Sequence, residues 1–217
     1  MYQPTHGHFR EDRVDVKHAL IRAHPFGAMV TPGAEGLVAN QFPFVVDAGA
    51  SPLGTLRAHM ARANGQWKDL DGSQEALVIF QGPYAYITPA WYPAKAETGK
   101  VVPTWNYAIV HAYGRPRIVH DPEWLLRHVS ELSDTNETTQ AVPWSVSDAP
   151  EEFVGALLKA IVGIEIEITR LEGKWKTSQN QPESAREGVV RGLTAQRDER
   201  SLAMAGLVTA TFGSGMR

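Results

Sequence analysis

Short segments rich in β-branched and aromatic residues occupy the chain from about residue 26 to residue 120. They include FGAMVT, GTLRAHM, EALVIFQGPYAYIT and VPTWNYAIVHAYGRPRIV. The sequences between them, such as PGAEG, ANGQ and LDGS, carry the glycine, proline, asparagine and aspartate residues that favour turns. Strands at this spacing favour a closed barrel or a sandwich over alternating β-α-β units. We therefore predict a mostly β or α+β fold, with a barrel core of about six strands.

Helical patterns flank this β region. Asp12 is placed to cap a helix that reaches about residue 23, and Asp121 precedes Pro122 at the start of another. The polar residues 133–150 predict a loop. EEFVGALLKAIVG predicts a helix with Phe153, Leu157, Ile161 and Ile164 at steps of four and three, followed by a half-buried strand in IEIEITRLEGKW.

The C-terminal part of the sequence also predicts helices. Ser184 and Glu187 have the spacing of a capping box, and a last helix is expected to begin at Asp198. We predict one domain over residues 1–217, with the barrel core at about 25–171 and a C-terminal helical extension at about 182–217.

Composition narrows the classes of function. The 217 residues carry a formal net charge of −3, which gives no electrostatic footprint for DNA or for an anionic membrane. The chain has no cysteine, so disulfides, thiolate nucleophiles and cysteine-ligated metals are excluded. Neither a signal peptide nor an apolar run of the ~20 residues that a membrane span needs is visible. A cytoplasmic location is expected.

Motifs that announce a catalytic class are missing from the sequence. It contains no P-loop, no G-x-G-x-x-G after a strand, no G-x-S-x-G and no H-E-x-x-H. His6 and His8 have the spacing of a metal pair but lie in a polar N-terminal segment without a third ligand in view. We predict no metal site.

One strand has two unlike faces. In TWNYAIVHAY, alternation places Trp105, Tyr107 and His111 on one face and Asn106 among small residues on the other. An aromatic face of this kind is compatible with a core strand that contains a hydrogen-bonded histidine. It is also compatible with a wall for a flat aromatic ligand, because ring faces stack well on such surfaces.

The segment HMARANGQW concentrates polar side chains at the end of a strand. An arginine buried without a partner is costly, so we expect the strand to break near Ala61 and Arg62 to turn outward. His59, Arg62 and Asn64 can then converge, and three such donors suit an anion such as phosphate. An ordinary polar turn explains the same residues, and the sequence alone does not separate the two.

A family resemblance joins these segments. HPFGAMVT, HMARANGQW, LVIFQGPYAYITPAWY, VPTWNYAIVHAYG, IVGIEIEIT and KTSQNQ occur in the order found in the PaiB family of FMN-binding split-barrel proteins. The resemblance covers Tyr2 to about Leu193 and implies a split β-barrel with flanking helices, assembled as a homodimer with FMN in an interface groove. In this sequence Thr177 stands where the family usually has leucine.

The resemblance also implies site residues and a function. It makes His59, Arg62 and Asn64 candidates for holding the FMN phosphate, and it places Trp105, Asn106, Tyr107 and His111 beside the flavin ring or the dimer seam. Further groups would come from near the partner subunit, from Lys176, Ser178, Gln179 and Asn180. The implied function is negative regulation of transcription through flavin binding, without direct DNA contact. The alternatives are a flavin-dependent oxidoreductase of the pyridoxamine-phosphate-oxidase-like superfamily and a haem protein using His24, His59 or His111.

Overall fold

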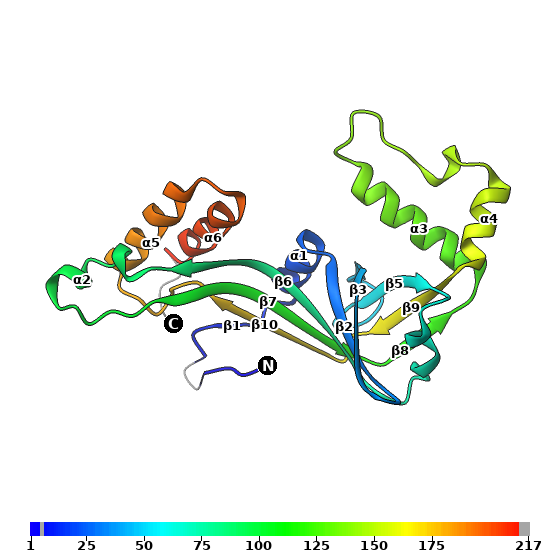
Figure 1. Cartoon of the computed structure of the whole chain (residues 1–217), viewed down its shortest axis with the longest axis horizontal. Coiled ribbons are helices and arrows are strands. Elements are labelled where there is room, and N and C mark those ends of the chain that lie inside the picture. Colours follow the sequence, from blue (N-terminus) through cyan, green and yellow to red (C-terminus); the bar gives the residue numbers. More distant parts are fainter. Residues whose placement is uncertain (5–6, 213–217) are drawn as a thin grey trace. The chain divides into compact units, whose positions relative to one another are not determined.

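The computed structural model describes residues 1–4 and 7–212 (Figure 1). Its strands are β1 (Arg10–Glu11), β2 (Phe26–Gly33), β3 (Gly36–Pro43), β4 (Val45–Asp47), β5 (Thr55–Ala61), β6 (Ala76–Ile87), β7 (Thr104–Gly114), β8 (Pro116–Val119), β9 (Ile161–Glu167) and β10 (Arg170–Lys176). Its α-helices are α1 (Val14–Ala23), α2 (Ala94–Glu97), α3 (Pro122–Glu137), α4 (Glu151–Lys159), α5 (Glu183–Gln196) and α6 (Glu199–Thr209). The predicted α+β class is confirmed, with more strands than the six or so expected.

The chain divides into two compact units. Unit 1 comprises Met1–Leu20, Gln81–Val110 and Glu172–Arg217, and unit 2 comprises Ile21–Phe80 and His111–Leu171. Strands β6 and β7 contribute residues to both units. The organisation as one domain with a helical extension stays a prediction, and residues 213–217 of that extension lie outside the described residues.

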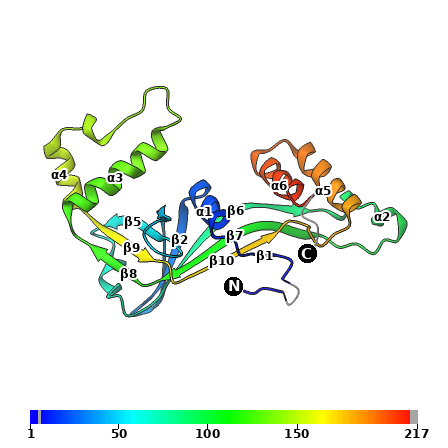
Figure 2. The ribbon, with the colours of Figure 1, turned by 180° about the vertical axis from the view of Figure 1, so that it is seen from behind.

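Unit 1 is a sheet covered on one face by two helices. The strands follow the order β1-β10-β7-β6, and β1 pairs antiparallel with β10. Helices α5 and α6 lie over one face of these strands in both views (Figures 1 and 2). Ile87 of β6 packs there with Leu193 of α5 and Met204 of α6, all almost fully buried. Burial of this apolar cluster is the main force that holds the helices on the sheet.

Unit 2 contains a four-stranded antiparallel sheet in the order β4-β5-β9-β8, and a β2-β3 hairpin that pairs with β6. Strand β5 pairs with β9 over its whole length, from Thr55 opposite Glu167 to Ala61 opposite Ile161. Ile164 and Ile166 are buried, as the alternation in IEIEIT predicts. That stretch is followed after a short turn by β10, so the predicted single strand is two strands.

Helices α3 and α4 differ from prediction at their ends. Asp121 caps α3 as expected, because its Oδ1 accepts a hydrogen bond from the backbone N–H of Glu123 at 2.9 Å. The helix then continues to Glu137, through residues that we predicted as loop. Thr135 and Asn136 donate side-chain hydrogen bonds to carbonyls four residues earlier, which lets polar residues continue the helix.

Helix α4 ends at Lys159, so the predicted helix is too long. Ile161 and Ile164 belong to β9 and do not share a helical face with Phe153 and Leu157. The two helical residues are exposed. An apolar spacing of four therefore predicted the helix correctly but not which side of it is buried.

A short loop connects the two C-terminal helices, α5 and α6. Helix α5 starts at Glu183 with Pro182 at its N-cap, so Ser184 lies inside the first turn and the predicted capping box is wrong. Asp198 caps α6 as predicted, by accepting a hydrogen bond from the backbone N–H of Ser201 at 3.0 Å. No helix within residues 1–4 and 7–212 is long and apolar enough to cross a membrane.

A substitution at Gly163 tests how tightly α3 packs on β9. A Cβ at this position would lie 2.4 Å from a ring carbon of Trp124. We expect Gly163→Ala to lower the free energy of unfolding by about 1–3 kcal/mol, because the indole must move. The control is Gly155→Ala in α4, where nothing lies within 4 Å of the new methyl group. It should leave stability unchanged or raise it by about 0.5–1 kcal/mol. Urea denaturation of both variants measures the difference, and equal effects would contradict it.

Candidate functional site

Unit 1 contains a pocket of about 470 Å³. Its walls come from the segment after β6, from the start of β7, from the end of β10 and from the start of α5. Four residues that the family resemblance pointed to line it together: Asn106, Lys176, Ser178 and Asn180. Its volume lies within the range of about 300–1,000 Å³ that small-molecule sites usually have.

Asn106 and Ser178 are buried residues of the pocket wall. Asn106 is 1% exposed, and its Nδ2 donates a hydrogen bond to Oγ of Ser178 at 2.8 Å. Its Oδ1 is buried with no hydrogen-bond partner among the described residues. A buried acceptor without a partner costs free energy, which a donor from a ligand or a water would recover.

Lys176 supplies a half-buried positive charge to the pocket, whose lining also contains the exposed Lys100 and Glu97. Its Nζ donates a hydrogen bond to the hydroxyl of Thr104. Burial, together with the nearby charge of Lys174, lowers the pKa of Lys176. A half-buried ammonium of this kind gains most from an anionic group beside it, because the low local dielectric strengthens the attraction.

The loop after Lys176 is held by its own side chains. Ser178 has a φ of 63°, in the left-handed region. Gln179 Oε1 accepts hydrogen bonds from the backbone N–H and the hydroxyl of Thr177, at 2.7 and 3.1 Å. Thr177 thus replaces the family's usual leucine with a polar group that finds its partner inside the loop. Asn180 is exposed at the pocket rim.

The aromatic face of β7 is the more exposed one. Asn106, Ala108, Val110 and Ala112 are buried, whereas Trp105 is 52% exposed and Tyr107 is half-buried. Within unit 1, the Trp105 ring lies 6.2 Å from that of Tyr84 and 5.7 Å from that of Tyr86. The interpretation of this aromatic face as a core face is therefore wrong. His111, in unit 2, has its ring 6.3 Å from that of Tyr113.

The backbone of the segment HMARANGQW follows the prediction, but its polar side chains have separate partners and do not converge. Strand β5 ends at Ala61 and Arg62 is exposed, as expected. The Arg62 guanidinium donates hydrogen bonds to the carbonyls of Lys159 and Ile161, at 2.9 and 3.0 Å. Asn64 caps the short 3-10 helix Gly65–Asp69 by accepting from the N–H of Gln66 at 3.1 Å. A phosphate role for these residues stays a prediction.

His59 turns toward α3. Its ring lies edge-on to that of His128, at 5.3 Å between centroids, and Trp124 stacks on the other histidine at 5.1 Å. His128 is 1% exposed, and neither of its ring nitrogens has a hydrogen-bond partner in the described part of the chain. Burial, with the nearby His59 and Arg57, lowers the pKa of His128 to about 4, and burial also lowers that of His59.

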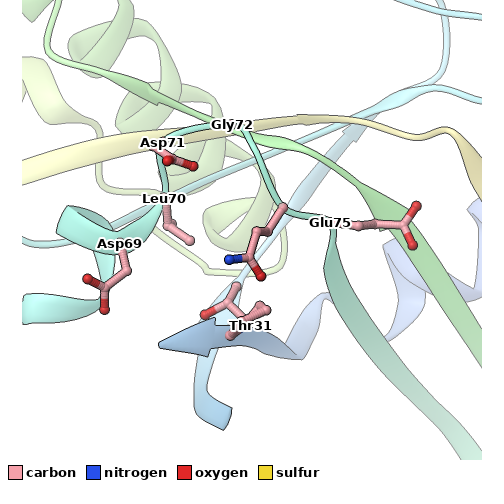
Figure 3. Close-up of a pocket in the computed structure, with 8 residues that line it drawn as sticks. Thr31, Asp69, Leu70, Asp71, Gly72 and Glu75 are labelled. Atoms are coloured by element: carbon pink, nitrogen blue, oxygen red, sulfur yellow. The ribbon is translucent and has the colours of Figure 1, made fainter. Parts of the chain in front are cut away.

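A second hollow, in unit 2, is too small for a cofactor. It measures about 10 Å³ and is lined by Thr31, Asp69, Asp71 and Glu75, among others. Figure 3 shows Asp69 and Glu75 on opposite sides of this hollow, with their carboxylates pointing away from each other. Over residues 1–4 and 7–212, no group of three histidine or acidic side chains is arranged to hold a metal. His6, which has the spacing of a metal pair with His8 but was not predicted to bind a metal, lies outside the described residues.

Comparison with known proteins decides the family. Residues 1–170 match the family model described as "Putative FMN-binding domain". The chain belongs to this FMN-binding family. FMN is the cofactor that the family assigns, and the predicted PaiB-like, split-barrel character is confirmed.

The relatives of this FMN-binding chain include uncharacterised and named proteins. An uncharacterised protein of Emericella nidulans is 39% identical, over 84% of this chain and 87% of its own. The Bacillus subtilis "Protease synthase and sporulation protein PAI 2" is 27% identical, over 96% of both chains. The FAD- and haem-binding protein of Mycobacterium smegmatis shares the fold, with a TM-score of 0.58 at 12% identity, over 84% of this chain and 80% of its own.

The residues of the unit 1 pocket fit FMN. The cofactor carries a phosphate and a ring edge with both hydrogen-bond donors and acceptors. The pocket offers an ammonium from Lys176, a hydroxyl from Ser178 and the unpartnered amide oxygen of Asn106. Tyr92 and Val101 add apolar wall. The donor set, the orphaned acceptor and the volume are all compatible with a flavin.

Sequence reasoning missed two sets of residues near these sites. Tyr92, Thr104 and the segment 100–103 line the pocket, although none of them was named as a candidate site residue. Trp124 and His128 escaped notice because helix α3 was predicted from Asp121 and Pro122 at its start. Their spacing of four residues was the available signal, since it puts both rings on one helical face.

The buried imidazole of His128 predicts an acid-sensitive stability. Its pKa is lowered in the fold, so the unfolded chain binds the proton more readily. The free energy of unfolding should therefore fall as the pH drops from about 6.5 to about 4, by up to roughly 3 kcal/mol. His128→Phe should remove most of this loss, whereas the matched change His120→Phe, at an exposed position, should not. Urea unfolding at pH 7 and pH 4.5 measures it, and an unchanged pH dependence in His128→Phe would contradict the prediction.

Proposed function

We propose that this protein holds FMN in the unit 1 pocket and works as a flavin-dependent redox protein. The observation that carries the proposal is the grouping of Lys176, Asn106 and Ser178 around one pocket of cofactor size. The family resemblance had pointed to these residues without indicating that they line one pocket within a single protomer. Membership of an FMN-binding family supplies the identity of the ligand.

Each pocket residue has a distinct task in this proposal. Lys176 faces the anionic part of the cofactor, where its lowered pKa reflects a charge that lacks full solvation. Asn106 and Ser178 hold the polar edge of the flavin, and Asn180 closes the rim. FMN itself supplies reversible uptake of two electrons, while the protein binds it, orients it and tunes its electronics. An anion-binding role for His59, Arg62 and Asn64 of unit 2 is a separate proposal, apart from the unit 1 pocket.

Assembly as a homodimer is part of the proposal. The exposed rings of Tyr84, Tyr86 and Trp105 support it, because clustered exposed aromatic side chains mark binding surfaces more often than isolated ones do. Sedimentation equilibrium of the purified protein gives the mass of the assembly directly.

Regulation of transcription is the second candidate function. The similarity to PAI 2 over 96% of both chains favours it. The net charge of −3 argues for regulation through bound flavin and not through direct DNA contact. Direct contact would give an affinity for DNA that falls steeply between two salt concentrations, and a titration with duplex DNA at both tests for it.

A flavin titration tests the pocket. We expect the wild-type protein to quench FMN fluorescence on binding, and Lys176→Met to weaken binding by at least about tenfold, because one charge-assisted contact is lost. The control is Lys95→Met, an exposed lysine of α2 that does not line the pocket, and it should bind as the wild type does.

One outcome of this titration would contradict the proposal. Equal affinities of the two lysine variants would move the flavin out of this pocket. A visible spectrum of the purified protein distinguishes the haem alternative, since haem and flavin absorb at different wavelengths.

A further inference from the structure

Helix α4 presents an apolar face to the outside of unit 2. None of its residues is buried. Phe153 is 57% exposed and Leu157 is 52% exposed, and Ala156 and Ala160 are exposed beside them. At 100° per residue these four positions fall on one side of the helix. The half-buried Val154 and Leu158 occupy the other side, toward the body of unit 2.

An amphipathic helix normally buries its apolar stripe, and α4 does the opposite. Its larger apolar side chains, Phe153 and Leu157, each leave more than half of their surface in the solvent, which is unfavourable for apolar groups. Leu126, Val142 and Trp144, from α3 and the segment that joins it to α4, are exposed as well. Such a concentration of exposed apolar side chains indicates a surface that another molecule covers.

The charges that border this apolar face are complementary to those of a second copy of α4. Glu152, in the first turn of α4, and Lys159, in its last turn, lie on the same flank of the apolar stripe. When a second α4 lies antiparallel across the stripe, that flank meets the same flank of the other helix in reverse order. Each glutamate then faces a lysine, so the surface is complementary to itself, as an interface with a two-fold axis requires.

We propose that α4 packs antiparallel against α4 of a second copy of this chain. Phe153 and Leu157 of each copy fill the contact, and Glu152 pairs with Lys159 of the partner subunit. The small residue Ala156 lies near the two-fold axis and lets the helices approach closely. The proposal rests on the homodimer of the proposed function and adds a specific contact to it.

The position of α4 suits this contact because its C-terminal end is fixed. The Arg62 side chain holds the carbonyls of Lys159 and Ile161, and the Arg62 N–H donates to the carbonyl of Ala160 at 2.8 Å. A helix that is already held in place loses little conformational entropy when a partner binds.

A single engineered cysteine tests the geometry. The chain has no cysteine of its own, so Ala156→Cys creates the sole thiol in the protein. With a two-fold axis near this residue, the two thiols of a pair come within reach of a disulfide, which needs Cα atoms no more than about 7 Å apart. Mild oxidation should then give a covalent dimer on a non-reducing gel. Glu123→Cys, an exposed position on α3, is the control and should stay monomeric on the gel.

Sedimentation equilibrium tests the energetics with the same chain. Leu157→Glu should weaken self-association by about a hundredfold, because it buries a charge in the apolar contact. Lys159→Glu should weaken it by about tenfold, and the double change Glu152→Lys with Lys159→Glu should restore it, since the pair is re-formed in reverse. Thermal melting of each variant verifies that it folds.

The outcomes separate this proposal from the proposed function. A dimer by sedimentation that Leu157→Glu leaves intact, with no disulfide from Ala156→Cys, overturns the α4 contact and leaves the homodimer standing. A monomeric wild type overturns both. FMN affinity is measured in parallel, because loss of the α4 contact should leave it unchanged at the pocket of unit 1.

Discussion

The small side chains on the buried face of β7 determine how the candidate site is built. Asn106, Ala108, Val110 and Ala112 are buried, so the larger rings of the strand must face the other way. Small residues also permit close approach: a Cβ on Gly82 would lie 3.1 Å from the carbonyl oxygen of Ala108. At the start of the strand this narrow face ends in a polar residue. Asn106 is thereby buried beside Ser178, and the pocket opens above that hydrogen bond.

Much of the fold could be predicted because its signals are local. Alternation in IEIEIT gave the buried isoleucines of β9, and Asp121 and Asp198 cap the helices that they were expected to cap. Errors arose where tertiary structure decides between two local possibilities. The apolar spacing continues from Leu157 to Ile161, yet the helix stops at Lys159 because β9 pairs with β5 from Ile161 onward.

The candidate site was only partly predictable. The cost of burying Arg62 predicted that the strand ends near Ala61, and β5 does end at Ala61. The partners of that arginine are carbonyls 97 and 99 residues away, and no local pattern reveals them. Lys176, Asn106 and Ser178 came from the family resemblance, whereas the pocket that unites them requires the folded chain. His128 was missed because its importance comes from the strand that α3 covers.

The hydrogen bonds of Arg62 bear on how relatives of this chain should be compared. An arginine that binds the carbonyls at the end of α4 serves the architecture, with or without a cofactor. Its presence in a distant relative is therefore a poor marker of flavin binding. The Lys176 side chain instead donates a hydrogen bond to the hydroxyl of Thr104, and both residues line the pocket. A relative that keeps the arginine but lacks the lysine would be expected to share the scaffold and not the ligand.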